Sequence, residues 1–280
     1  MTIRMEERMG KVASPWQPAQ LEGMSASLRI DLNADLGESF GHYRLDDTPL
    51  LGEITSANVA CGFHAGDPVE MRAMVRAAVA HGVVIGAHPG YADRQGFGRR
   101  DLAATPDEIA ADVIYQLGAL SAVCAAAGTR VRYVKPHGAL YNRSARDATV
   151  AHTIAAAIRD VDPSLTLLGL AGSESIRAAE RVGIPIAREA FVDRAYQSNG
   201  MLVPRDRPGA VLHDVSAIAT RAVRLVREGR LHSIDGADLA LTADSLCTHG
   251  DGSHALEIVR AVRAQLEAAG VRIVSFVVRE

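Results

Sequence analysis

Lysine is nearly absent from this chain of 280 residues. Lys11 and Lys135 are the only two lysines among 30 basic residues, so arginine carries almost all of the positive charge. The 33 acidic residues give a net charge of −3, and no basic stripe is present that could neutralise a phosphate backbone. Aromatic residues make up only 4% of the chain and are not interleaved with cations. The composition therefore argues against a nucleic-acid-binding protein.

Cysteine and long apolar runs are also scarce. Cys61, Cys124 and Cys247 are too few and too dispersed for a disulfide framework or a paired-cysteine zinc site, which favours a reducing compartment. The apolar runs are short and interrupted, so we predict no membrane-spanning helix. The first twenty residues lack the apolar segment of a signal peptide. We therefore expect a cytoplasmic protein that has no membrane partner.

Small and aliphatic residues, in contrast, are plentiful. Hydrophobic residues make up 48% of the chain, and with so few aromatics the core must consist mainly of alanine, valine, leucine and isoleucine. Residues 1–27 show no periodicity and contain Pro15 and Pro18, so we predict a mobile N-terminal extension. No linker divides the remainder, and we predict that residues 28–280 form a single domain.

From residue 28 onward, segments typical of buried strands alternate with segments typical of helices. The predicted strands are 28–33, 54–60, 83–88, 132–135, 165–170, 185–189, 239–247 and 271–278. The predicted helices are 68–81, 105–127, 145–159, 173–182, 210–228 and 253–268. Seven or eight parallel strands with intervening helices predict an α/β fold, a (β/α) TIM-type barrel. An open doubly wound sheet is the alternative, because a strand count does not prove closure.

Polar segments directly follow most of the predicted strands. They are rich in Asp, Asn, His and Gly, and they span residues 31–38, 58–67, 86–91, 135–142, 189–196 and 248–251. Because the carboxyl ends of parallel strands meet at one face of a barrel, we expect these segments to form a single catalytic face there.

Asp35 is the first candidate for a general base. It follows Asn33 by two residues, so the carboxylate and the amide lie on the same side of an extended chain and can share a substrate or a water. The structural alternative is that Asp31, Asn33 and Asp35 cap a turn and the next helix. Glu38 is expected to orient a neighbouring group rather than to contact substrate.

Histidines occur at several strand ends. His64 lies between glycines, which allow the backbone to approach a ligand closely. A neighbouring proline stiffens the backbone beside His88 and beside His137. A single histidine is more often structural than catalytic, but His249 brings the number at such positions to four. This repetition favours a functional role.

Lys135 carries a different signal, because arginine fills nearly every other basic position. A lysine at a strand end indicates a need for a compact point charge, beside an oxyanion or a phosphoryl group, or for a titratable amine. A lysine that snorkels from the rim is the structural alternative. Arg194 either pairs with Asp193 or presents its guanidinium to a substrate carboxylate. Asp251 either contacts a ligand or caps a helix.

Several longer motifs occur in a fixed order along the chain. They are DLNADLGESFG (31–41), SANVACGFHAGDP (56–68), GAHPGYADRQGFGRR (86–100), YQLGAL (115–120), VKPHGALYN (134–142), EAFVDRAY (189–196), LVPR (202–205) and CTHGD (247–251). Together they resemble the LamB/YcsF family, a family of 5-oxoprolinase subunits. The resemblance runs from about Arg29 to the C-terminus, and Ala92 departs from it where a proline is expected.

The resemblance implies an irregular TIM barrel of the glycoside hydrolase/deacetylase kind. It also implies ATP-dependent opening of 5-oxo-L-proline (pyroglutamate) to L-glutamate, ADP and phosphate, carried out jointly with subunits B and C of a 5-oxoprolinase. The chain has neither a G-x-x-x-x-G-K-[ST] loop nor a strand-linked G-x-G-x-x-G. We therefore expect ATP and its Mg²⁺ mainly on the partner subunits, with ring opening on this chain.

On this interpretation Asp35 activates water, while Lys135 and His137 stabilise developing charge. His64 and His88 shape the pocket. The predicted catalytic residues are Asp35, His64, Lys135 and His137. The predicted substrate contacts are Asn33, Asn58, His88, Tyr141, Arg194, His249 and Asp251.

The sequence leaves a bound divalent metal open. Two or three histidines together with Asp35 would suit a hydrolytic Zn²⁺ or Mn²⁺ site. Related deacetylase barrels use an Asp-His-His site, which is an argument from fold alone. No H-x-x-x-H or H-E-x-x-H spacing supports it. A metal-dependent deacetylase and a non-catalytic carboxylate-binding barrel are the alternatives to lactam hydrolysis.

Overall fold

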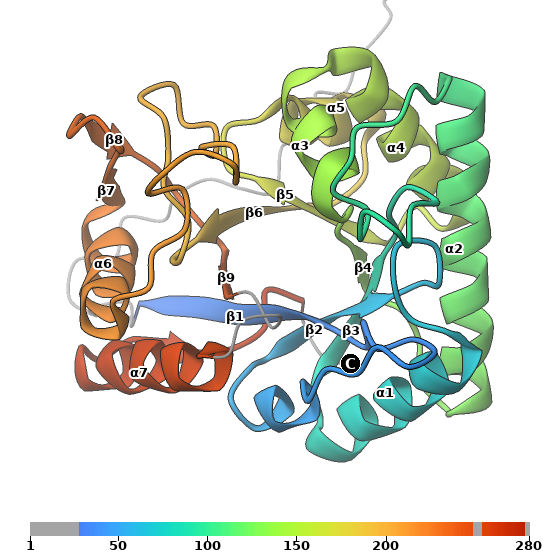
Figure 1. The fold of residues 1–280 in the computed structure, drawn as a ribbon, viewed down its shortest axis with the longest axis horizontal. Helices are drawn as coiled ribbons and strands as arrows, with labels where there is room; N and C mark the ends of the chain where they lie inside the picture. Colours follow the sequence, from blue (N-terminus) through green and yellow to red (C-terminus); the bar gives the residue numbers. More distant parts are fainter. Residues whose placement is uncertain (1–27, 249–253, 278–280) are drawn as a thin grey trace, which may run out of the picture.

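A closed ring of seven parallel strands forms the centre of the protein (Figure 1). The structure, a computed structural model, describes residues 28–248 and 254–277. The strands of the ring are β1 (Arg29–Leu36), β2 (Ser56–Ala60), β3 (Val84–His88), β4 (Tyr133–Val134), β5 (Thr166–Leu170), β6 (Ile186–Phe191) and β9 (Ser245–Thr248). Strand β1 pairs with β2 on one side and with β9 on the other, which closes the ring. The predicted barrel is confirmed, and the open sheet is excluded.

Helices surround the ring (Figure 1). They are α1 (Pro68–His81), α2 (Pro106–Ala126), α3 (Gly138–Arg146), α4 (Ala148–Val161), α5 (Glu174–Val182), α6 (Val215–Glu228) and α7 (Ala255–Ala268), with a 3₁₀ turn, η1, at Thr48–Gly52. Local sequence fixes where helices begin. The Asp67 side chain accepts two backbone hydrogen bonds at the start of α1, and Thr105 forms a reciprocal capping box with Glu108 at the start of α2.

The predicted helix 145–159 is wrong at its beginning, because two helices meet there. Asp147 has an extended backbone, and its side chain accepts hydrogen bonds from the backbone N–H groups of Thr149 and Val150. This cap ends α3 and starts α4. Helix α3, which was not predicted, begins directly after the strand-end residue His137.

The predicted strand 239–247 divides into two. Asp238–Ala240 (β8) pairs antiparallel with Arg230–His232 (β7) in a separate two-stranded sheet, while Ser245–Thr248 enters the ring. A polar Thr-Ala-Asp stretch separates the halves. The last predicted strand is also shorter, since Arg272–Ile273 (β10) pairs with the start of β1 outside the closed ring.

Helix α2 is the one helix among the described residues that is long and apolar enough to cross a membrane, by length and composition alone. In the structure one face of the helix is buried, including Ile109, Val113, Leu117 and Leu120. The helix contacts α1, α4 and β3, so it covers the barrel.

Polar side chains fill the middle of the barrel. On β1, Asp31, Asn33 and Asp35 alternate with apolar residues and therefore share one face of the strand. Asn33 accepts a hydrogen bond from Asn58 on β2 and donates one to Ser245 on β9, so this face lines the interior. Barrels of this type usually fill with branched apolar side chains. The buried polar layer therefore marks the interior as functional.

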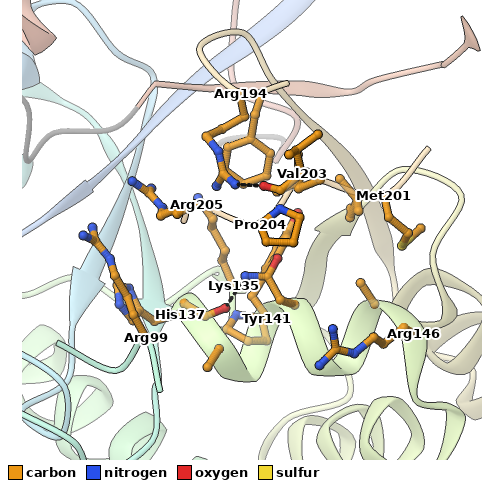
Figure 2. Close-up of a pocket in the computed structure, with 18 of the residues that line it drawn as sticks. Arg99, Lys135, His137, Tyr141, Arg146, Arg194, Met201, Val203, Pro204 and Arg205 are labelled. Carbon is orange, nitrogen blue, oxygen red and sulfur yellow. Dashed lines mark hydrogen bonds between the residues drawn. The ribbon is translucent and has the colours of Figure 1, made fainter. Parts of the chain in front are cut away.

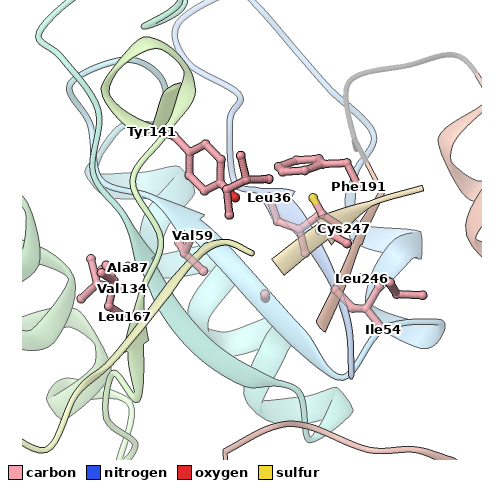
Figure 3. Packing of buried hydrophobic residues seen from close by; sticks show 14 of the residues in the cluster. Leu36, Ile54, Val59, Ala87, Val134, Tyr141, Leu167, Phe191, Leu246 and Cys247 are labelled. Atoms are coloured by element: carbon pink, nitrogen blue, oxygen red, sulfur yellow. The ribbon is translucent and has the colours of Figure 1, made fainter. Parts of the chain in front are cut away.

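Apolar side chains pack outside the ring and close its amino-terminal end. Val59, Ala87, Val134 and Leu167 come from four successive strands and are buried in the main core (Figure 3). A second, smaller cluster lies near the amino ends of the strands, and Phe276 and Val277 pack against it. It consists of Val84, Tyr133, Leu168 and Ala187.

Gly86 allows the Tyr133 ring to enter the barrel. A Cβ atom at position 86 would lie 2.2 Å from that ring. The ring cannot withdraw freely, because its hydroxyl donates a hydrogen bond to Asn58 in the polar layer.

We expect Gly86→Ala to lower the free energy of unfolding by about 1–3 kcal/mol or more, because the new Cβ atom would clash with the Tyr133 ring. Chemical denaturation measures the difference. Gly118→Ala, in α2 where a new Cβ meets nothing within 4 Å, should instead raise the free energy of unfolding by about 0.5–1 kcal/mol. Similar effects of the two substitutions would contradict this account.

Candidate active site

The carboxyl ends of the strands bring most of the predicted residues to one cavity of about 610 Å³. Asp35 lies near the end of β1, His88 ends β3, and Lys135 directly follows β4. The predicted residues that line the cavity are Asp35, His88, Lys135, His137, Tyr141 and Arg194. Figure 2 shows Lys135, His137 and Tyr141 central in this view, with Arg99 and Arg205 on one side and Arg146 on the other.

Lys135 is buried between two carboxylates. Its Nζ lies 2.9 Å from Asp35 Oδ1 and 2.9 Å from Glu189 Oε1, and the side chain is 2% exposed. Burial alone would lower the pKa of Lys135, but the charges of Asp35 and Glu189 outweigh it and the pKa is raised well above its usual value. Lys135 is therefore a fixed ammonium. The predicted point charge fits this geometry, whereas a snorkelling lysine and a titratable amine do not.

Asp35 is held in place by three neighbours. Its Oδ1 accepts hydrogen bonds from Lys135 and from the Asn58 amide at 2.8 Å, and its Oδ2 lies 3.3 Å from His88 Nε2. Asn33 and Asn58 are fully buried beneath the cavity and are not part of its lining. Asn58 donates to Asp35 and to Asn33, so the two amides support Asp35 from below.

Three histidine rings lie against one another. His64 and His137 stack with ring centroids 3.7 Å apart, and His137 Nδ1 lies 2.9 Å from His88 Nε2. Burial lowers the pKa of His64 and of His137 well below the usual value, and neighbouring histidines add to this effect. Both rings are therefore neutral at neutral pH. His64 lies behind the cavity wall rather than in it.

Backbone carbonyls fix the orientation of two of these rings. His88 Nδ1 donates to the carbonyl oxygen of Lys135 at 2.7 Å, and His137 Nε2 donates to that of Phe97 at 2.8 Å. Phe97 has a φ of +53°, the only positive φ at a non-glycine among the described residues. Gly98 follows it, and a Cβ there would lie 2.6 Å from His64 Cβ. This tight turn thus packs against the histidines and aims a carbonyl at His137.

Glu38 joins the histidines more closely than the sequence suggested. Its Oε1 lies 3.3 Å from His64 Nε2 and 3.4 Å from His137 Nδ1, and the side chain is 3% exposed. The sequence-based expectation gave Asp35 as the carboxylate that accompanies the histidines. In the structure Asp35 Oδ2 contacts His88, whereas Glu38 faces the rings of His64 and His137.

Arg194 and Tyr141 line the cavity in different ways. The Arg194 guanidinium donates to the carbonyl oxygens of Val203 and Ala210, so it braces a loop instead of extending toward a ligand (Figure 2). Burial, and then the neighbouring charge of Arg205, lower its pKa to about 10. For Tyr141, burial and then Glu189 raise the pKa well above its usual value, which keeps the phenol protonated beside the cavity.

Glu189 and Cys247 belong to the site but were not predicted. Strand alternation could have found both, since Glu189 follows the buried Ala187 by two residues and Cys247 follows Ser245. Cys247 Sγ lies 3.1 Å from Lys135 Nζ, yet burial raises its pKa well above the usual value, so it is a neutral thiol. The predicted contacts His249 and Asp251 lie outside the described residues.

This combination defines a class of protein, a parallel α/β barrel whose interior holds a buried charged site beneath one cavity. The chain belongs to the LamB/YcsF family, whose model matches residues 30–279.

Similar proteins align with nearly all of the residues that the family model matches. One of the 5-oxoprolinase A subunits of Agrobacterium fabrum is 54% identical over 248 residues, which are 88% of this chain and 97% of the relative. The 5-oxoprolinase A subunit of Paracidovorax citrulli is 53% identical over 250 residues, 89% of this chain and 100% of the relative. The crystal structure of a lactam utilization protein from Thermus thermophilus has a TM-score of 0.84 and 46% identity, covering 89% of this chain and 100% of that one.

Asp31 lies below this site, and its raised pKa makes the stability of the fold depend on pH. It is fully buried, and the hydroxyls of Thr55, Ser56 and Ser245 donate to it. Burial raises its pKa to about 6, although these hydrogen bonds oppose the shift. The folded state therefore holds a proton on Asp31 that the unfolded chain releases between about pH 4 and 6.

We expect the wild type to lose stability relative to Asp31→Asn as the pH rises through that window. The folded state binds more protons there, so the free energy of unfolding falls with pH, by about 3 kcal/mol for a shift of this size. Chemical denaturation of both proteins at pH 4 and pH 7 measures the difference. Asp160→Asn, at an exposed site, is the control, and its free energy of unfolding should match that of the wild type at both pH values. A pH-independent difference between wild type and Asp31→Asn would refute the assignment.

Proposed function

We propose that this chain opens the ring of 5-oxo-L-proline to give L-glutamate, as the hydrolytic component of an ATP-dependent 5-oxoprolinase. The observation that carries the proposal is its identity of more than 50%, over nearly the whole domain, to proteins named as the A subunits of 5-oxoprolinases. On this proposal the chain is a hydrolase that acts on a cyclic amide C–N bond.

The site supplies groups that this reaction needs. A five-membered lactam is a resonance-stabilised amide, so attack by water requires an activated nucleophile and stabilisation of the developing oxyanion. Asp35 lies on the cavity wall as the base for water, and the Lys135 ammonium next to it supplies positive charge. Water adds to the carbonyl carbon, the C–N bond breaks, and the ring nitrogen takes a proton to become the amine of glutamate.

ATP enters through the partners in this proposal. Phosphorylation of the lactam carbonyl oxygen on subunits B and C, with Mg²⁺ accompanying the ATP there, would make the ring carbonyl carbon more electrophilic toward water. Cleavage of the C–N bond would then leave the phosphoryl group on the new carboxyl oxygen as an acyl phosphate, and a second water would release phosphate and L-glutamate. Arg99, Arg146 and Arg205 line the outer part of the cavity and are exposed, so they can receive a substrate carboxylate or a phosphoryl group. Arg194 also lines the cavity but donates two of its five N–H groups to carbonyls, which leaves fewer for this role.

Glutamate release from 5-oxo-L-proline tests the proposal. The assay uses the purified chain with and without ATP and Mg²⁺, and with and without subunits B and C. We expect release only in the complete mixture. Release by the chain alone would overturn the assignment of activation to the partners, and no release in any mixture would overturn the lactam hydrolase itself.

Asp35→Asn tests the base in that complete mixture. The amide keeps the shape of the side chain but cannot accept a proton, so we expect turnover to fall by about 10²- to 10⁴-fold. Lys135 keeps its partner Glu189, so the variant should still fold, with a lower melting temperature than the wild type, and circular dichroism checks that it is folded at the assay temperature. Asp46→Asn, an exposed aspartate outside the cavity lining, should retain full activity. Unchanged turnover in Asp35→Asn would remove Asp35 from the mechanism.

A further inference from the structure

We propose that Glu38, His64, His88 and His137 together bind one divalent transition-metal ion, and that Zn²⁺ is the ion this donor set fits best. Binding is a property of this chain alone and requires neither lactam nor partner subunits. Only its catalytic consequence rests on the proposed function.

The four side chains converge from four separate parts of the ring. One ligand atom from each lies within 4.8 Å of all the others, and all four side chains are buried. Glu38 Oε1 is 3.3 Å from His64 Nε2 and 3.4 Å from His137 Nδ1. A tetrahedral zinc site with bonds of about 2.0–2.1 Å places neighbouring ligand atoms about 3.3 Å apart. The two distances from Glu38 Oε1 to the histidine nitrogens already match this separation.

The histidine tautomers leave lone pairs directed into the cluster. A carbonyl oxygen can only accept, so His88 carries its hydrogen on Nδ1 and His137 carries its hydrogen on Nε2. When neither ring carries a second hydrogen, the other nitrogens, His88 Nε2 and His137 Nδ1, face each other as lone pairs at 2.9 Å. Such a contact is repulsive without a cation beside it. Donation of the second ring N–H to a carbonyl is also how metal-binding histidines are usually oriented.

The charges around the cluster support the same conclusion. The carboxyl groups of Asp35, Glu38 and Glu189 are 12%, 3% and 0% exposed, and Lys135 is the one buried ammonium among the described residues that contacts any of them. These carboxyl groups lie in a space that is largely closed to water, where they favour a nearby cation.

The position of the cluster gives it access to ligands. Glu38, His88 and His137 line the cavity, while His64 supports the cluster from behind. When bound there, such an ion supplies a Lewis acid that polarises a carbonyl oxygen and acidifies a bound water. Asp35, which contacts His88, lies next to that position as a base.

Metal analysis of the purified chain tests the proposal. The chain is stripped with a chelator, reloaded with Zn²⁺, freed of excess metal and analysed by mass spectrometry. A parallel sample takes Co²⁺, whose visible absorption reports four-coordinate geometry. We expect about one ion per chain, a tetrahedral cobalt spectrum, and a higher melting temperature with metal. His88→Ala and His137→Ala should each weaken Zn²⁺ binding by at least about 100-fold.

His152→Ala, an exposed histidine on α4, is the matched control and should bind as the wild type does. Less than a tenth of an ion per wild-type chain would overturn the proposal, because a shared proton would then be the cation between His88 and His137. Wild-type affinity in His88→Ala would also overturn it. These readouts are independent of turnover. Ring opening by metal-free protein would refute the catalytic consequence alone, whereas metal binding without any ring opening would refute the proposed function alone.

Discussion

The pairing of one buried lysine is the interaction on which the rest of this barrel depends. Lys135 stands where an unpaired ammonium would cost several kcal/mol, and carboxylates from β1 and β6 offset that cost at 2.9 Å each. Those carboxylates would be equally costly without the lysine. The pairing therefore joins three strands of the ring through a space that other barrels fill with apolar side chains.

A polar interior changes what the remaining residues must do. Since the inside of the ring contributes hydrogen bonds instead of hydrophobic burial, the interface between the ring and its helices has to supply the apolar core, and leucine, isoleucine, valine and alanine dominate there. The polar layer must also be satisfied almost completely. Asn33 and Asn58 meet this need by linking Asp35, Ser245 and Tyr133 into one network.

Strand-end chemistry made much of the site predictable from sequence. Asp35, Lys135, His88 and His137 were expected to converge because parallel strands share one carboxyl face, and the structure places all four at one cavity. The two carboxylates Glu38 and Glu189 were not assigned their positions. Glu38 lies beyond the end of β1, where strand alternation no longer applies. Glu189 points into the barrel only in the register that its pairing with distant strands sets. The turn at Phe97, which aims a carbonyl at His137, depends on such long-range packing too.

The surroundings of Lys135 explain why a lysine, and not an arginine, occupies this position. Its Nζ lies within 3.3 Å of Asp35, Glu189, Asn33 and Cys247, which approach from the three strands β1, β6 and β9. A small ammonium can donate in three directions, whereas a planar guanidinium holds its donors in one plane. The same residue also accepts the His88 N–H with its carbonyl oxygen, and His88 in turn faces Asp35. Lys135, Asp35 and His88 thus form a closed triangle of contacts. Displacing any one of them shifts both a charge and an imidazole orientation, so the electrostatics and the geometry of the site are set by one residue.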